Sequence, residues 1–155
     1  MKRVLYLISV ILSATIFTAC SHNTVYSEFI PIPSGEWGEN ALQHFDFTVM
    51  DKEAGYDILL YIRHTERYPY QNMWLFVRGN PLHYSDTIEF YLADDRGRWL
   101  GDKHHGFIEM PVLLESDYHF PDTGKYYFAV QHGMRDSLLR GVTDVGIEIK
   151  RNGKE

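Results

Sequence analysis

The chain has 155 residues, and 21 acidic against 15 basic side chains give it a formal net charge of −6 at pH 7. This negative charge argues against nucleic acid or an anionic membrane surface as a partner. The length suits a single domain with one core, and because Cys20 is the only cysteine, no disulfide can form within the chain.

The N-terminus has the layout of an export signal. Two basic residues precede an apolar run from Val4 to Phe17, and small residues stand directly before Cys20. The run is shorter than the roughly 20 residues that a membrane-spanning helix needs. We therefore interpret residues 1–19 as a signal peptide that is cleaved before the cysteine.

Cys20 becomes the N-terminus of the mature protein in this interpretation. We predict that it carries fatty-acyl chains such as palmitate, which hold the protein on a lipid bilayer, because more than one chain is needed for stable anchoring. An ordinary secretory signal is the alternative. Ser21 stands where inner-membrane lipoproteins commonly have aspartate, so we expect the outer membrane, with the protein facing the periplasm.

Residues 20–36 are predicted to form the lipidated N-terminus and a tether, because the positions after Cys20 are mostly small and polar. Residues 37–155 are predicted to form one β domain. From Leu42 to Val49, apolar and polar residues alternate, which indicates a half-buried strand. Tyr56 to Arg63 repeats this period and indicates a more central strand.

Further short strands are predicted along the rest of the chain, at Met73–Val77, Thr87–Ala93, Arg98–Gly101, Phe107–Met110, Lys125–His132 and Val142–Lys150. Asp94 to Gly97 has the composition of a hairpin turn. Gly133 to Arg140 is expected to form one or two helical turns that end at Gly141. About eight short strands without a long helical period predict an all-β fold, an antiparallel β-sandwich that is jelly-roll-like.

Residue types suited to catalysis are present without a recognisable motif. His104 and His105, with Asp102 nearby, are the best metal candidates. Because neighbouring residues of a strand point to opposite faces, we interpret these three as part of a solvated loop. Nucleophile motifs such as Gly-x-Ser-x-Gly are missing from the sequence. We predict no enzyme activity, no metal and no cofactor, and a metal-assisted hydrolase is the most remote alternative.

Aromatic side chains are the other candidates for binding. Trp37 follows a Pro-Ser-Gly turn and is expected at the surface, whereas Trp74 lies in an apolar strand and is expected in the core. Exposed aromatic residues favour protein interfaces. A carbohydrate- or peptidoglycan-binding module is the alternative, in which the available aromatic residues are Trp37, Trp74, Trp99, Tyr68 and Tyr70.

Three long stretches, Arg63–Phe76, Asp86–Gly101 and Gly124–Gly141, are similar to the gliding motility lipoprotein GldH family. This resemblance implies an envelope lipoprotein that is associated with the gliding and type IX secretion apparatus. It also implies a lipid anchor on Cys20 and other envelope proteins as partners. We therefore predict a non-enzymatic docking or assembly component of that machinery.

The first of these stretches suggests where a partner would bind. Arg63 leaves a buried strand and is expected to pair with Asp86 or Asp94, beside an aromatic Tyr-Pro-Tyr loop. The predicted partner- or ligand-binding residues are Trp37, Arg63, Tyr68 and Tyr70. A packed loop that covers one end of the sandwich is the alternative interpretation.

Overall fold

The structure is a computed structural model that describes residues 23–80 and 84–153, so the predicted signal peptide and Cys20 lie outside the described residues. Within this part of the chain, strands alternate with turns, and the only helix is one 3-10 turn, η1. No helix of the described residues is long and apolar enough to cross a membrane. The elements are β1 (Thr24–Pro31), η1 (Pro33–Gly35), β2 (Glu36–Gly38), β3 (Gln43–Val49), β4 (Tyr56–His64), β5 (Asn72–Asn80), β6 (Tyr84–Tyr91), β7 (Asp102–Lys103), β8 (Ile108–Tyr118), β9 (Gly124–His132), β10 (Leu138–Arg140) and β11 (Val142–Arg151).

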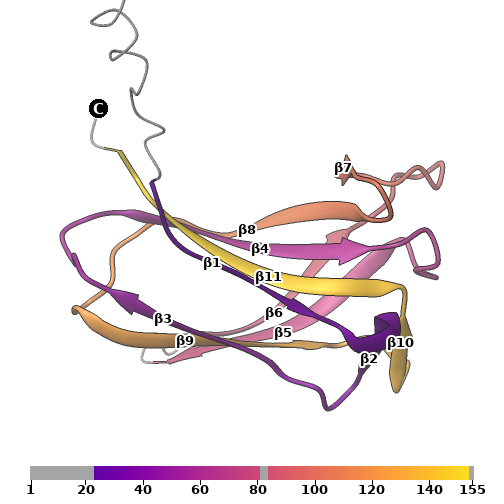
Figure 1. The fold of residues 1–155 in the computed structure, drawn as a ribbon, viewed down its shortest axis with the longest axis horizontal. Helices are drawn as coiled ribbons and strands as arrows, with labels where there is room; N and C mark the ends of the chain where they lie inside the picture. The colour runs from indigo at the N-terminus through magenta and orange to yellow at the C-terminus, as the bar shows by residue number, and fades with distance from the viewer. Residues whose placement is uncertain (1–22, 81–83, 154–155) are drawn as a thin grey trace, which may run out of the picture.

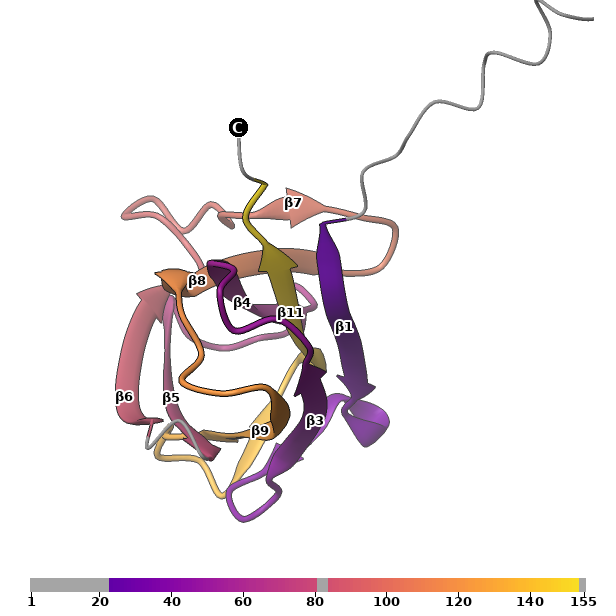
Figure 2. The ribbon, with the colours of Figure 1, turned by 90° about the vertical axis from the view of Figure 1, so that its left-hand side faces the viewer.

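Two antiparallel sheets pack face to face, as Figures 1 and 2 show. Their strand orders are β1-β11-β4-β8-β7 and β3-β9-β5-β6, and a small β2-β10 ribbon lies beside them. Apart from the two-residue β7, each sheet has four strands, and the chain crosses between the sheets in the order of two Greek keys. This is the jelly-roll arrangement. The predicted fold class is confirmed.

The core lies between the two sheets. It is filled by the apolar side chains at every second position of the strands. In β3 and β4, every second side chain is buried, and the residues between them face outward or toward neighbouring loops. The antiparallel register then brings apolar side chains opposite one another in the β4-β11 pair, namely Ile58 with Ile149, Leu60 with Ile147 and Ile62 with Val145. Such cross-strand apolar pairs stabilise a sheet and fix its register.

Aromatic rings fill one part of this core. The ring of Phe47 stacks on those of Phe128 and Tyr126, at centroid distances of 5.7 and 5.8 Å. Phe120 meets Phe47 edge-on at 5.9 Å. Offset and edge-on ring pairs of this kind add to the stabilisation from burial alone. Phe47 also meets Tyr26 of β1 at 5.6 Å, so the rings connect the two sheets without a disulfide.

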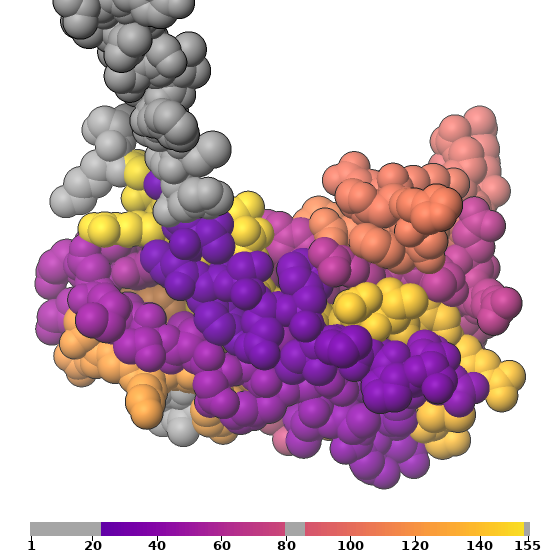
Figure 3. Space-filling model, in the orientation of Figure 1, coloured from indigo at the N-terminus to yellow at the C-terminus, as the bar shows by residue number. Residues whose placement is uncertain are grey.

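The folded domain begins earlier than predicted. Thr24 to Pro31 form strand β1, which pairs along its whole length with β11. The predicted tether therefore extends too far, because residues 24–36 belong to the folded domain, and the predicted domain start at residue 37 is wrong. The side chains of β1 are half-buried or exposed, as suits an edge strand, and the indigo strip across the face in Figure 3 is this strand with the turn that follows.

The segment before β11 also differs from the prediction. Leu138 to Arg140 form strand β10, which pairs with β2, so the expected helical turns are wrong. Leu139 is fully buried and lies opposite Trp37. This pairing joins residues about 100 positions apart, and local helix propensity cannot report it. The predicted hairpin turn at Asp94–Gly97 is confirmed by a hydrogen bond from the Asp94 N–H to the Arg98 carbonyl at 2.9 Å.

The two ends of the sandwich carry different parts of the chain. At the first, the tether end, β1 begins next to the end of β11, where the Arg151 N–H donates to the Asn23 carbonyl at 2.6 Å (Figure 1). At the other, the loop end, lie η1, the loop after β4 and the link from β10 to β11 (Figure 1). The eight residues of β1 separate the two ends by about 25 Å at roughly 3.3 Å per residue.

Candidate functional site

Trp37 is a core residue. Its side chain has 0% exposure, its indole N–H donates to the Ala41 carbonyl at 2.7 Å, and its ring meets His132 edge-on at 5.3 Å. The expectation that Trp37 is exposed is therefore wrong. Pairing of β2 with β10 draws this residue inward, and a partner cannot contact it without unfolding the ribbon.

Arg63 is held in a structural ion pair. Its Nε donates to Glu109 Oε2 at 2.7 Å, and the two side chains are mostly covered. The guanidinium lies over the ring of Phe29 at 3.7 Å from the centroid, a cation–π contact. The predicted pairing with Asp86 or Asp94 is wrong, because the β4-β8 register places Glu109 directly opposite Arg63.

The Tyr-Pro-Tyr loop has one buried and one half-buried ring. Tyr68 is 3% exposed, and its hydroxyl donates to the Asn72 carbonyl at 2.8 Å. Burial raises the pKa of this hydroxyl. Tyr70 meets Tyr68 edge-on and donates to Asp136 Oδ2 at 2.8 Å. Tyr68 therefore anchors the loop over the end of the sandwich. Of the two tyrosine rings, Tyr70 is the one that reaches the surface.

The histidine pair lies in an exposed loop. His104 and His105 are both solvent-exposed, and the His104 ring stacks on Phe107 at 4.9 Å. Within residues 23–80 and 84–153, no group of three or more His, Cys, Asp or Glu side chains is placed to hold a metal ion.

An aromatic surface lies on the outer face of the β3-β9-β5-β6 sheet. Trp74, Phe76 and Tyr91 are 38%, 39% and 57% exposed. Along β5, Trp74 and Phe76 alternate with the buried Met73, Leu75 and Val77. The register places Trp74 opposite Glu89 and Tyr91 opposite Asn72, so the three rings share one face. The expectation that Trp74 is a core residue is therefore wrong.

The backbone at Gly133 forms the floor of this surface. A Cβ atom there would lie 3.1 Å from Phe76 Cζ and 3.4 Å from Trp74 Cβ, so both side chains pack closely against this glycine. The Met134 sulfur accepts a hydrogen bond from the backbone N–H of Trp74 at 3.3 Å. A hollow of about 350 Å³ opens beside the rings, lined by Tyr70, Asn72, Trp74, Gly133, Met134 and Arg135. We call Tyr70, Trp74, Phe76, Tyr91 and Met134 the aromatic surface.

Of these five residues, the sequence prediction contained only Tyr70 as a site residue. Phe76, Tyr91 and Met134 were missed, although β5 alternates apolar residues on both faces and so leaves rings on its outer side. Aromatic rings with an adaptable methionine can bury apolar area against another molecule. The class that the fold and surface define is a jelly-roll domain with an exposed aromatic face.

Comparison with known proteins identifies the family. The family model described as "GldH lipoprotein" matches residues 24–149. The gliding motility lipoprotein GldH homolog of Christiangramia forsetii is 30% identical over 92% of this chain and 93% of its own length. The gliding motility lipoprotein GldH of Flavobacterium johnsoniae is 26% identical over 91% and 93%. The chain belongs to the GldH lipoprotein family and is a membrane-anchored protein of the cell envelope.

Solved structures with a related arrangement of strands share little sequence with this chain. A family GH115 4-O-methyl-α-glucuronidase has a TM-score of 0.47 and 10% identity over 84% of this chain and 17% of its own. A carbohydrate-binding module, CBM28, has a TM-score of 0.41 and 10% identity over 82% and 73%. At these scores neither likeness bears on function.

Proposed function

We propose that this protein is a non-enzymatic docking or assembly component of the gliding and type IX secretion apparatus. Membership of the GldH lipoprotein family supports a role connected with gliding motility. Anchoring through acyl chains on Cys20, at an outer membrane and facing the periplasm, is part of this proposal. Anchoring would raise the effective concentration of the domain for neighbours on the same bilayer.

The aromatic surface is the observation that carries the docking role. Trp74, Phe76 and Tyr91 expose large rings on the outside of a rigid sheet rather than on a loop. Rings on a rigid support lose little conformational entropy on binding, and buried aromatic anchors commonly provide most of the binding energy of a protein interface. We infer that another envelope protein covers this face.

Affinity purification from native envelopes tests the docking role. The lipidated protein with Trp74→Ala and Phe76→Ala should lose, after mild cross-linking, the partners that the unchanged protein recovers. Leu113→Ala is the matched control, because Leu113 is a 57% exposed apolar residue on the other sheet. Recovery of the same partners by the double variant would contradict the proposal.

Glycan binding at the same surface is the second candidate. Asn72 donates to Glu89 Oε1 at 2.6 Å between Trp74 and Tyr91, so polar groups lie beside exposed ring faces as sugar recognition needs. Quenching of Trp74 fluorescence by peptidoglycan fragments or soluble glycans, lost in Asn72→Ala, would favour this function. An unchanged spectrum with every glycan would leave the protein partner as the better explanation.

A further inference from the structure

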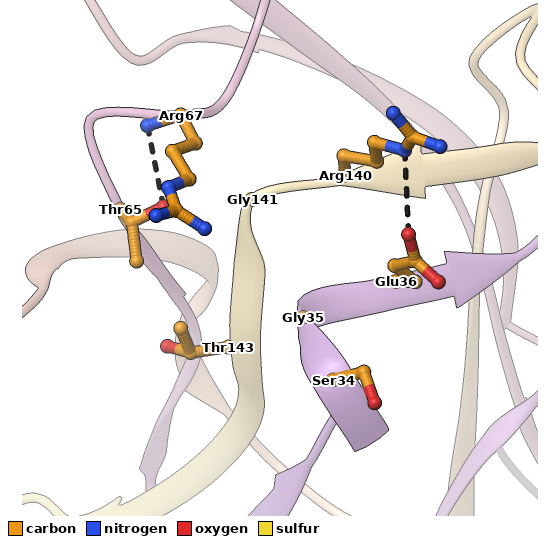
Figure 4. A pocket seen from close by; sticks show the side chains of 8 residues that line it. All are labelled: Ser34, Gly35, Glu36, Thr65, Arg67, Arg140, Gly141 and Thr143. Carbon is orange, nitrogen blue, oxygen red and sulfur yellow. Dashed lines mark hydrogen bonds and ion pairs between the residues drawn. The ribbon is translucent and has the colours of Figure 1, made fainter.

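We infer that the cavity at the loop end binds a carboxylate group of a second polypeptide, at a site separate from the aromatic surface. The cavity has a volume of about 710 Å³ and is lined by Ser34, Gly35, Glu36, Thr65, Arg67, Arg140, Gly141 and Thr143 (Figure 4). These residues come from η1, β2, the loop after β4 and the link between β10 and β11.

Backbone hydrogen bonds hold these segments together. The Thr65 N–H donates to the Gly141 carbonyl at 2.8 Å, and the Gly141 N–H donates to the Gly35 carbonyl at 2.8 Å. Ser34 has a φ of +59°, an unusual conformation for a residue other than glycine, and it lies on the rim. Strained residues persist only where the surrounding structure fixes them. The cavity is therefore a preformed feature of the fold.

One charged donor of the cavity, Arg67, has no carboxylate partner among the described residues. The arginines that form ion pairs among the described residues are Arg63, Arg98, Arg140 and Arg151, and Arg67 has no carboxylate partner there. Figure 4 shows Arg67 on one side of Gly141 and the Arg140–Glu36 pair, at 3.3 Å, on the other. The Thr143 hydroxyl oxygen is inaccessible to solvent and has no hydrogen-bond partner in the described part of the chain.

A carboxylate fits this set of donors. It is an acceptor with two oxygens, and the planar guanidinium of arginine binds it with two parallel hydrogen bonds. An orphaned buried hydroxyl is unfavourable, so Thr143 adds an unpaired polar group to the wall of the cavity. Of the charged side chains that line the cavity, Arg140 is paired with Glu36, and Arg67 is left to bind the ligand.

A neighbouring hollow indicates a polypeptide as the source of the carboxylate. It has a volume of about 390 Å³ and shares Thr65 and Arg67 with the first cavity. Its lining adds one cation, Lys103, one carboxylate, Glu66, and apolar walls from Phe107 and Ile108. An extended segment that combines acidic and apolar side chains can occupy both hollows, whereas a free small anion would use only one.

The position of the cavity argues against lipid headgroups as the ligand. The tether enters at the opposite end of β1, and only residues 20–23 connect the proposed acyl anchor to that strand. Four residues reach at most about 14 Å. An upright domain thus presents the loop end away from its own bilayer. This orientation rests on the proposed anchor, whereas binding of a carboxylate to the cavity does not.

Fluorescence anisotropy of the lipidated protein in detergent tests the inference. The probe is a short fluorescein-labelled peptide of alternating glutamate and glycine, with a glutamine version as its neutral counterpart. Arg67→Gln should weaken binding of the glutamate peptide at least about tenfold, as expected for loss of a charged bidentate contact. Arg67→Lys keeps the charge but not the planar fork. Its affinity for the glutamate peptide should lie between those of the unchanged protein and Arg67→Gln.

Arg78→Gln is the matched control, because it removes an exposed guanidinium from the outer face of β5, far from the cavity in the fold. It should change the affinity by less than about twofold. Equal losses for Arg67→Gln and Arg78→Gln, or equal binding of the glutamine peptide, would overturn the inference. Displacement of the peptide by inorganic phosphate or by phosphatidylglycerol vesicles at matched concentrations would overturn it in favour of a phosphate ligand.

Discussion

The burial of the tryptophans at positions 37 and 74 is the reverse of what their neighbours in the sequence suggest. Trp37 follows a turn and is fully buried, whereas Trp74 lies in an apolar strand and is 38% exposed. The pairing of β2 with β10 places Trp37 in the core. Trp74 points to the outer face of a strand that carries apolar residues on both faces. The residues adjacent to Trp37 do not show its pairing, and the apolar run around Trp74 is compatible with either face of the strand.

This reversal predicts the stability of the two alanine variants. Trp37→Ala should lower the free energy of unfolding by about 3–5 kcal/mol, because it leaves a large cavity and an unpaired carbonyl at Ala41. Trp74→Ala should lower it by about 1 kcal/mol, since much of its ring already meets water. Urea titrations measure both. Equal losses would show that the two burial assignments are wrong.

Two buried histidines predict a pH dependence. His64 and His132 are 0% and 2% exposed, and burial lowers the pKa of both below its ordinary value. The unfolded chain therefore takes up protons first as the pH falls below about 6.5. Stability should be constant above that pH and decrease below it by up to about 1.4 kcal/mol per pH unit for each histidine.

Urea midpoints at pH 7.5 and pH 5.5 measure this dependence, and His64→Gln/His132→Gln provides the comparison. The variant is expected to be less stable overall but to lose less stability between the two pH values. His104→Gln/His105→Gln, at exposed positions, should keep the full dependence. An identical slope in all three proteins would contradict the assignment.

Among the strands, those whose alternation has one clean inner face could be predicted from the sequence. Strands β3, β4 and β11 fall where the period-two pattern places them, because their burial follows directly from the pattern. Strands β1 and β10 could not be predicted, since each forms only by pairing with a distant segment. The cavity at the loop end has the same origin, because Ser34, Thr65 and Arg140 meet only in the folded chain.

The link between β10 and β11 depends on Gly141. This residue has a φ of +88°, and a Cβ atom there would lie 2.5 Å from the Tyr68 backbone nitrogen. Gly141→Ala should therefore lower the unfolding free energy by about 3 kcal/mol or more, as backbone strain adds to a clash that cannot relax.

Gly97→Ala is the control for this prediction. Gly97 has a φ of +74°, but no atom lies within 4 Å of its added Cβ, so only the conformational penalty of about 1 kcal/mol applies. Thermal unfolding of the two variants compares them. A smaller loss for Gly141→Ala than for Gly97→Ala would contradict the close approach of the loop end segments.

At the scale of the whole molecule, the fold begins so near Cys20 that the tether is short. Strand β1 starts at Thr24 and β11 ends beside it, so both emerge at the tether end. Cys20→Ala should move the protein from the membrane to the soluble fraction and abolish metabolic labelling with palmitate, because the acyl chains provide the proposed attachment. Membrane association that persists without label would contradict the anchor.

Docking through the aromatic surface is the central claim about the whole molecule. The measurement that tests it most directly is site-specific photo-cross-linking in native envelopes, with a photoreactive residue at Tyr91 and, as control, at Leu113 on the opposite sheet. A discrete cross-linked product with an envelope protein at Tyr91, and none at Leu113, is the predicted result. No product at Tyr91, or the same product at both positions, would contradict the claim.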